Sequence, residues 1–303
     1  MKNKINILLV GAVTFVWASI FWLGDNNLWQ AERSASLELY KPWVYRQLVP
    51  MLARLLESIG IRIDLAIVLI VTASGIGLYL ALRSLVNHYY PDNDALVVCS
   101  VFAGLLMFGY ARLQYDLTTA WLWTLALLYI AKEETYNYLM LFPLICLNRE
   151  TAFLLIIIYT IHKPHDISET AYQIGVYALV AVALRVMFAD NGGVESWVEP
   201  LQNIQRFINH PVQTLLHIAT AGVMLWIAAK GWQQKPAFLR LAFLVLAPAL
   251  TAAYIIAGQS FEVRVFWELF PVVVLLALPT ITDRIQWLNP SISTITKIKA
   301  TGS

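Results

Sequence analysis

The sequence predicts an all-α protein, a polytopic bundle of transmembrane helices, and three observations support that prediction. Apolar residues make up 59% of the 303 residues, charged residues make up only 13%, and the mean hydropathy is +0.64. A soluble domain carries about 25% charged residues. The charged residues cluster between long apolar stretches. The 11 Trp and 14 Tyr suit the aromatic belts found where a membrane meets water.

The first apolar run, residues 5–23, follows Lys2 and Lys4. At about 19 residues it is longer than the 7–15 residues of a signal-peptide core, so we interpret it as an uncleaved first span. Further apolar segments raise the prediction to about ten membrane-embedded helices. These segments are Ile63–Leu82, Ala95–Tyr110, Leu117–Ala131, Tyr138–Leu147, Ala152–Ile161, Ala171–Phe188, Val212–Ala229, Leu241–Gly258 and Val265–Ile281.

The triplet Asn148-Arg149-Glu150 is the strongest interruption of this apolar pattern. A bare arginine in hydrocarbon costs roughly 2.5–3.5 kcal/mol, so these residues must reach water, pair, or serve a site. The apolar runs on either side are each about 10 residues long, where a full span needs about 20. Either they form one span with the triplet at its middle, or they form two short helices that meet at a polar turn.

The charge of the loops favours the second alternative. A hairpin places three basic segments on the side of Lys2 and Lys4, as the positive-inside rule prefers. The prediction is therefore a short broken hairpin with the triplet at its outer end, in a multi-pass protein of the inner (plasma) membrane with both termini cytoplasmic. The basic segments concerned are His162–His165, Lys230–Arg240 and the tail with Arg284, Lys297 and Lys299.

Residues 24–62 form the longest polar segment and, in this topology, the first outer loop. Within it, Leu48, Met51/Leu52, Leu55/Leu56 and Ile59 recur at helical spacing, and Pro50 stands in the expected first turn. The pattern predicts an amphipathic helix at the outer interface, either as a platform for Arg46 or as a simple cover of the bundle. Residues 1–288 are predicted to form one integral membrane domain and residues 289–303 a short cytoplasmic tail.

Motifs of soluble enzymes are absent from the sequence. It contains no Walker loop, no dinucleotide fingerprint, no His-Glu-x-x-His and no Gly-x-Ser-x-Gly. Cys99 and Cys146 lie inside apolar runs and are expected to be buried thiols. His162 and His165 have metal-like spacing without a carboxylate or cysteine partner. We therefore predict no metal site, no cofactor and no nucleic-acid partner, and leave dependence on a divalent cation open.

Arginines and carboxylates gather in the predicted outer loops. Transfer from a lipid-linked phosphate donor needs a cation that holds the phosphate, which arginine does through two hydrogen bonds. It also needs a carboxylate that takes the proton from the attacking hydroxyl. Both groups must lie at the membrane surface, where the headgroup of a polyprenyl phosphate lies. The outer side of this chain offers several of each.

The layout of the whole chain and three short segments resemble the GT-C superfamily, polytopic glycosyltransferases that use polyprenyl-phosphate sugars. The segments are Tyr45–Arg54, Leu147–Leu154 and Glu262–Pro271. The resemblance implies a hexosyltransferase that moves a sugar from a polyprenyl-phosphate donor to a glycan, lipid or protein acceptor, in envelope polysaccharide synthesis. It also implies a catalytic acid in the first outer loop. The chain lacks the paired Asp-Asp or Asp-Glu dipeptide of several branches and a large C-terminal outer domain.

The candidate site follows from the chemistry and the resemblance together. Glu38 is the first candidate for the base and Asp25 the second. Arg149 is expected to contact the donor phosphate, with Arg264 or Arg46 as a second cation. The supporting polar residues are Glu150, Asp116, Arg112 and Glu262.

Plainer interpretations stand beside these assignments. Asp116 has the position of a helix cap before Leu117. Arg264 and Glu268 are four residues apart, so they can form a salt-bridged patch on one helix face. Arg149 and Glu150 can pair with each other or with neighbours and so hold the hairpin together.

Two other functions remain open at this stage. The first is a transporter or lipid flippase with the broken hairpin as its substrate site, because transporters use discontinuous helices in this way. The second is a non-catalytic subunit of an envelope polysaccharide assembly system. The depth of Arg149 separates transfer from transport, since transfer requires the outer interface and transport an aqueous path at the midplane.

Overall fold

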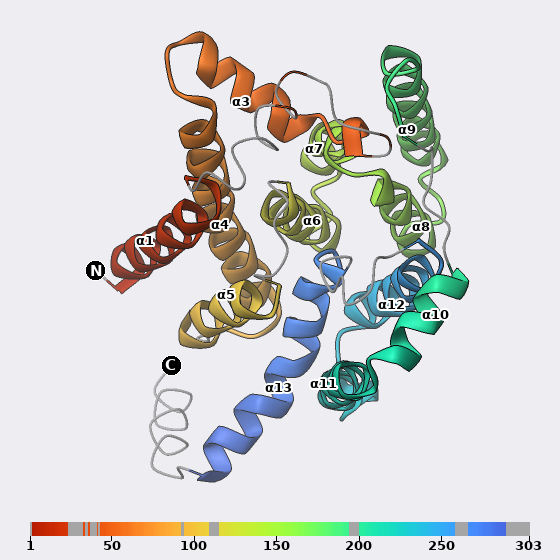
Figure 1. Ribbon diagram of the computed structural model, residues 1–303. Helices are drawn as coiled ribbons and strands as arrows, with labels where there is room; N and C mark the ends of the chain where they lie inside the picture. Colours follow the sequence, from red (N-terminus) through yellow and green to blue (C-terminus); the bar gives the residue numbers. More distant parts are fainter. Residues whose placement is uncertain are drawn as a thin grey trace.

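The computed structural model describes residues 2–23, 33, 36, 41, 43–91, 94–108, 115–193, 200–257 and 266–288 (Figure 1). These residues contain no β-strand, so the all-α class is confirmed for the part of the chain described. The predicted tail, 289–303, lies outside it. The helices in chain order are α1 Lys2–Trp22, η1 Trp43–Tyr45, α3 Leu48–Ser58, α4 Ile63–Tyr89, α5 Asp94–Phe108, α6 Asp116–Ala131, α7 Thr135–Asn148, η2 Glu150–Ala152, α8 Phe153–His162, α9 Ile167–Met187, α10 Pro200–Asn209, α11 Pro211–Ala229, η3 Trp232–Gln234, α12 Ala237–Ala257 and α13 Phe270–Leu288.

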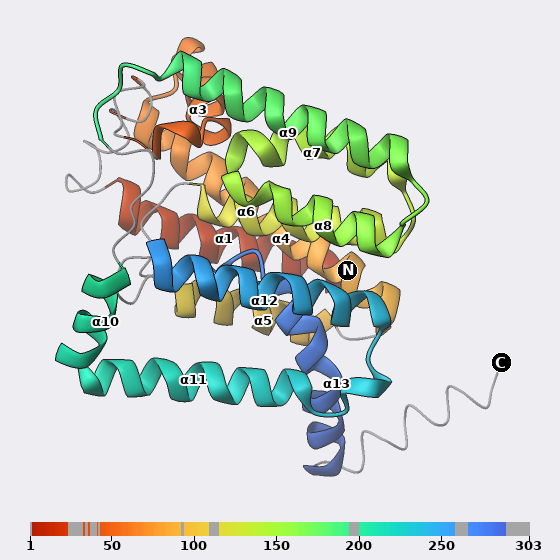
Figure 2. The same cartoon turned by 90° about the vertical axis from the view of Figure 1, so that its right-hand side faces the viewer.

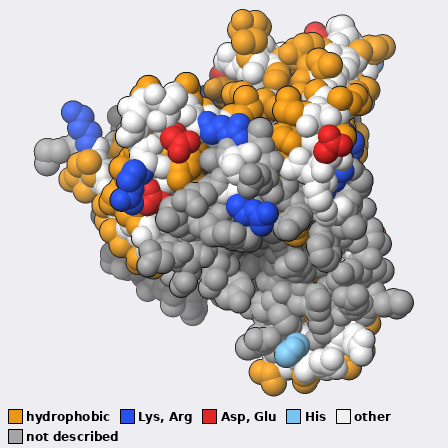
Figure 3. Space-filling model, turned by 45° about the horizontal axis from the view of Figure 1, so that its top comes forward, with side chains coloured by type: hydrophobic (Ala, Val, Ile, Leu, Met, Phe, Trp, Pro, Cys, Tyr) orange, Lys and Arg blue, Asp and Glu red, His pale blue; other side chains and the backbone are white. Residues whose placement is uncertain are grey.

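Four of these helices are long and apolar enough to cross a membrane: Asn3–Ile20, Ile63–Tyr89, Ile167–Met187 and Ala237–Ile256. Shorter apolar helices accompany them in α5, α6, α8 and α13. On the face shown in Figure 3, hydrophobic side chains cover much of the described surface and charged side chains are few and scattered. The chain is therefore a membrane protein, and the count of about ten embedded helices stays a prediction.

Helix α4 is the central element and packs against α1 on one side and α6 on the other. Small residues allow the close approach. A Cβ added at Gly75 would lie 2.6 Å from the Thr14 side chain of α1, and one at Gly77 would overlap the Trp121 ring of α6. Small residues at helix contacts are the usual means by which membrane helices pack closely. This packing fixes the start of α6, where the polar residues of the site begin.

The chain forms two helices around the polar triplet rather than one span. Helix α7 ends at Asn148, Arg149 has extended backbone, and η2 leads into α8. Helix α8 then returns, and its last residue, His162, packs with a ring distance of 4.8 Å on Phe238 at the start of α12. Figure 2 shows α7 and α8 beneath α9, joined at the end opposite the α8–α9 connection. The triplet therefore lies at the tip of a hairpin.

Helix α3 occupies the segment in which the sequence predicts an amphipathic helix. Val49 and Ala53 are buried against the bundle, whereas Met51, Leu55 and Ile59 are 53%, 63% and 71% exposed. Part of the apolar stripe that the spacing identifies thus points away from the bundle, as contact with lipid would require, whereas Leu48 and Leu56 pack against the core. The position of α3 at a membrane surface stays a prediction.

Helix α10 lies in a stretch that the sequence predicts as an outer loop. Its Ile204 and Ile208 are four residues apart, on one helix face, and are 48% and 70% exposed. The segment is too short and too polar for a span, so a search for long apolar runs passes over it.

The membrane topology can be tested by labelling. The start of α1, the α8–α9 connection and the α11–α12 connection lie at one end of the molecule (Figure 2). In a background of Cys99→Ser and Cys146→Ala, a cysteine at the exposed Glu57 is expected to react with an impermeant maleimide added outside whole cells. A cysteine at the exposed Gln233 is expected to react only after the cells are opened. Labelling of both from the same side would contradict the topology.

Candidate functional site

Among the described residues, the most deeply buried charged side chains form a three-residue cluster, Asp116, Arg149 and Glu268, which we call the arginine clasp. Arg149 Nε lies 3.1 Å from Glu268 Oε1, and Arg149 Nη1 lies 3.7 Å from Asp116 Oδ1. All three side chains are at most 4% exposed. Glu268 Oε1 also accepts a hydrogen bond of 2.8 Å from Thr151 Oγ1. The clasp thus ties together the start of α6, the tip of the hairpin and the turn before α13.

Hydrogen bonds around the tip hold the α7–η2 break in place. The Asn148 side-chain amide donates to Thr119 Oγ1 at 2.8 Å, and the Gln47 backbone N–H donates to the Leu147 carbonyl at 2.8 Å. Carbonyls at a helix end have no partner within the helix, so the Gln47 contact satisfies one group that the break would leave open. The break is therefore fixed by α6 and by the segment before α3.

A second ion pair, Arg46–Glu150, lies next to the clasp and nearer the surface. Arg46 Nε is 3.1 Å and 3.2 Å from the two Glu150 carboxylate oxygens, and Arg46 Nη1 donates to the Tyr115 hydroxyl at 2.6 Å. The side chains are 13% and 35% exposed. Burial acts to lower the pKa of Arg46, but the Glu150 and Tyr115 oxygens outweigh it and hold the pKa above its ordinary value. Arg46 therefore keeps its charge at every physiological pH.

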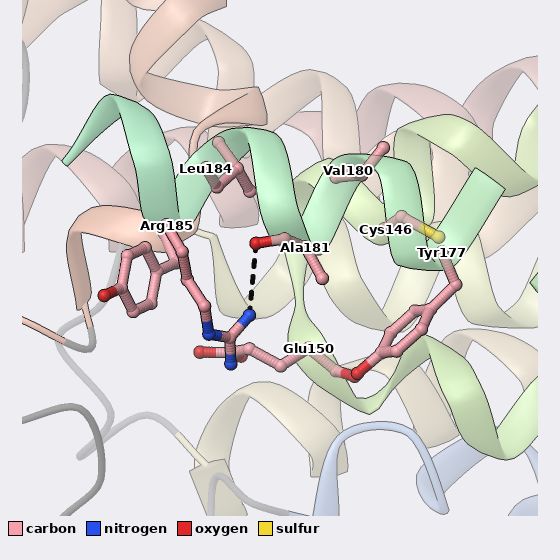
Figure 4. Close-up of a pocket in the computed structure, with 8 residues that line it drawn as sticks. Cys146, Glu150, Tyr177, Val180, Ala181, Leu184 and Arg185 are labelled. Carbon is pink, nitrogen blue, oxygen red and sulfur yellow. Dashed lines mark hydrogen bonds between the residues drawn. The ribbon is translucent and has the colours of Figure 1, made fainter. Parts of the chain in front are cut away.

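A small pocket lies on the other side of Glu150, against α9 (Figure 4). The Tyr177 hydroxyl donates to the Glu150 carbonyl at 3.1 Å. Arg185 stacks on the Tyr45 ring at 5.4 Å, and its Nη1 donates to the Ala181 carbonyl at 3.2 Å. The residues that line the pocket are Tyr45, Cys146, Glu150, Tyr177, Val180, Ala181, Leu184 and Arg185.

The structure brings four of the candidate residues together: Arg46, Asp116, Arg149 and Glu150. Arg149 and Glu150 are adjacent in sequence, yet each forms its described ion pair with residues from other segments. Tyr115, not Asp116, occupies the N-cap position of α6, and Asp116 is the first helical residue. The capping interpretation of Asp116 is therefore wrong. The candidates Asp25, Glu38, Arg112, Glu262 and Arg264 lie outside the described residues.

Several residues of the site were not assigned to it from the sequence. Glu268 was considered only as a partner of Arg264, and its described partners are Arg149 and Thr151. Tyr115 and Arg185 have no spacing that links them to the triplet. The sequence did offer one signal for Glu268. A carboxylate next to aromatic residues in an apolar segment indicates a functional site.

The thiols and imidazoles are the remaining side chains that could bind a metal ion. Among the described residues, no group of three or more His, Cys, Asp and Glu is placed to hold a metal ion. Cys146 is buried as expected, whereas Cys99 is exposed, so the expectation of a buried thiol at Cys99 is wrong. A comparison of the chain with protein-family models, with curated proteins and with solved structures finds no match in any of the three.

Proposed function

We propose that this protein is a membrane glycosyltransferase that moves a sugar from a polyprenyl-phosphate donor to an acceptor on the extracytoplasmic side of the plasma membrane. The observation that supports the proposal best is the meeting of two arginines and three carboxylates at the hairpin tip, from segments far apart in sequence. Phosphate binding and proton transfer need these two kinds of group at one place.

Arg46 is the better placed of the two arginines to hold the donor phosphate. Arg149 is enclosed between two carboxylates and is 4% exposed, whereas Arg46 faces one carboxylate and is 13% exposed. A fixed guanidinium in a partly desolvated groove stabilises the leaving phosphate as its negative charge develops. In this arrangement Arg149 positions the tip of the hairpin, and Arg46 is the cation that meets the donor.

Most of the remaining candidates are close in sequence to residues at the hairpin tip. Arg112 precedes Asp116 by four residues, and Arg264 precedes Glu268 by four. Glu38 precedes Arg46 by eight, and a residue spans at most about 3.6 Å of extended chain. We assign Glu38, ahead of Asp25, as the base, and Arg264 as a second cation beside Arg46. Glu150, Asp116, Arg112 and Glu262 support them.

Arg46→Lys tests the phosphate assignment. Lysine keeps the charge but loses the planar fork, so we expect roughly tenfold weaker binding of polyprenyl phosphate to the purified protein, or more. Arg46→Ala is expected to bind still less. Binding is measured by tryptophan fluorescence quenching or by native mass spectrometry in detergent.

Arg54→Lys on α3 is the matched control, because it makes the same change at an arginine outside the tip. Its affinity for polyprenyl phosphate is expected to equal that of the wild type. If Arg46→Ala, purified as a monodisperse protein, binds the lipid phosphate as tightly as the wild type, the assignment of Arg46 is wrong.

Transport is the second candidate function, and the break of the hairpin at Arg149 favours it. Discontinuous helix pairs with polar residues at the break are typical of substrate sites in transporters. A reconstituted transporter moves a substrate across vesicles that contain no acceptor, whereas a transferase needs both donor and acceptor and releases polyprenyl phosphate. Release of the lipid phosphate that depends on an acceptor would exclude transport as the primary activity.

A further inference from the structure

Helix α10 crosses the ends of two neighbouring helices rather than lying alongside them. In Figure 2, α11 and α12 run roughly parallel, and α10 extends from one end of α12 to the adjacent end of α11. Figure 1, in which α11 is seen end-on, shows α10 bridging the same two helices. This end of the molecule also carries the hairpin tip, and we call it the tip end. Because α12 is long and apolar enough to cross a membrane, α10 lies close to the plane of that membrane.

The corner between α10 and α11 is fixed by local chemistry. His210 is not helical, and Pro211 begins α11, where its missing N–H costs no helical hydrogen bond. Thr214 Oγ1 of α11 donates to the Phe207 carbonyl at 2.9 Å. That carbonyl belongs to the last turn of α10 and has no partner within its own helix. The sequence therefore specifies the turn that sets α10 across α11.

A contact with α12 fixes the depth of α10. The centre of the Phe207 ring lies 6.0 Å from the centre of the Tyr254 ring. Tyr254 stands two residues before the end of the candidate span Ala237–Ile256, which is about 3 Å along the helix. In a membrane the end of a span lies where the acyl chains meet the headgroups. Helix α10 therefore lies at that boundary.

Helix α10 has an open apolar side and an open polar side. Ile204 and Ile208 lie on one helix face and are 48% and 70% exposed. Gln205 and Asn209, the next residue in each case, lie about 100° further round the helix and are also exposed. Phe207, three residues after Ile204, belongs to the apolar side and packs on α12. The apolar side is thus turned toward the span.

We propose that α10 is an interfacial helix that binds the surface of the lipid bilayer at the tip end. Ile204 and Ile208 insert among the acyl chains of that leaflet, and Gln205 and Asn209 face the water. A short helix with separate apolar and polar sides lies in this way at the boundary between headgroups and acyl chains. The inference does not depend on the proposed glycosyltransferase, because the lipid beneath α10 takes part in no reaction.

The surfaces on both sides of α10 identify lipid as the occupant of its apolar side. Only 22% of the candidate span of α12 is buried within the protein, so lipid covers much of that helix in a membrane. The open apolar surface also continues round the corner, where Val212 and Leu215 of α11 are 71% and 67% exposed. The lipid layer that surrounds α12 therefore continues beneath α10.

Spin labelling of the full chain in phosphatidylcholine vesicles tests the proposal. In the background of Cys99→Ser and Cys146→Ala, a nitroxide is attached to Ile204→Cys, Ile208→Cys, Gln205→Cys or Asn209→Cys. Its collisions with oxygen, which concentrates in hydrocarbon, and with a water-soluble nickel chelate are then measured. The two labels on the apolar side are expected to collide mainly with oxygen, at a depth of about 5–10 Å. The two on the polar side are expected to collide mainly with nickel.

A label at Leu244→Cys, which is 61% exposed on α12, is the reference for a position that faces lipid. Nickel collisions as frequent at Ile204 and Ile208 as at Gln205 would show water on the apolar side. Few collisions with either reagent would show that another protein segment or a second copy of the chain covers it. Either result would overturn the proposal, and so would the same ratio of oxygen to nickel collisions at all four α10 labels.

Discussion

Replacing Arg149 by methionine is expected to lower the stability of the protein by about 3–5 kcal/mol, the largest effect on stability of any change at the site. The substitution leaves the Asp116 and Glu268 carboxylates in the interior without the guanidinium that lies 3.7 Å and 3.1 Å from them. A buried ion pair that loses one partner is much costlier than a pair replaced as a whole, because the remaining charge stays desolvated. The measurement is the melting temperature in detergent, followed by fluorescence-detected size-exclusion chromatography.

The control is Arg185→Met, which makes the same change at an exposed arginine and is expected to shift the melting temperature only slightly. The triple variant Arg149→Met, Asp116→Asn, Glu268→Gln removes all three charges at once. It should recover part of the lost stability, because no unpaired charge remains. Equal melting temperatures for Arg149→Met and Arg185→Met would show that the clasp does not hold the hairpin.

The hairpin could be predicted from the sequence because the features that indicate it lie in short stretches of the chain and contribute independently of one another. Each basic loop contributes to the charge bias independently, and the short runs around Asn148 are visible without any knowledge of packing. The helices α4, α6 and α12 follow from length and apolar composition in the same way. These features need no information about which helix lies beside which.

The partners within the site could not be predicted, because they depend on packing. Asp116 and Glu268 are far from Arg149 in sequence, and they meet it because the fold brings the start of α6 and the turn before α13 to the hairpin tip. Helical spacing suggested Arg264 for Glu268, a pair that stays a prediction because Arg264 lies outside the described residues, and local sequence suggested a cap for Asp116. Both suggestions use neighbours in the chain, whereas burial of a charge is satisfied by whichever opposite charge the fold supplies.

Replacing Glu38 by glutamine is expected to slow sugar transfer by roughly 10²–10⁴-fold, the contribution typical of a positioned general base. The amide keeps the size and hydrogen bonding of the carboxylate but cannot accept the proton of the attacking hydroxyl. The main effect should be on kcat, because binding of the lipid phosphate rests on the arginines and not on Glu38. Transfer is measured with purified protein and a radiolabelled polyprenyl-phosphate sugar.

Two variants from the same outer segment decide what that loss means. Glu57→Gln removes an exposed carboxylate of α3 and is expected to leave transfer unchanged. Asp25→Asn tests the second candidate, which directly follows the first span. Because proton abstraction needs one base within about 2.6–3.2 Å of the acceptor oxygen, only one of Glu38 and Asp25 should show the large effect. If Glu38→Gln and Asp25→Asn both transfer sugar at the wild-type rate with intact expression, the first outer segment does not carry the base, and the glycosyltransferase proposal loses its chemical support.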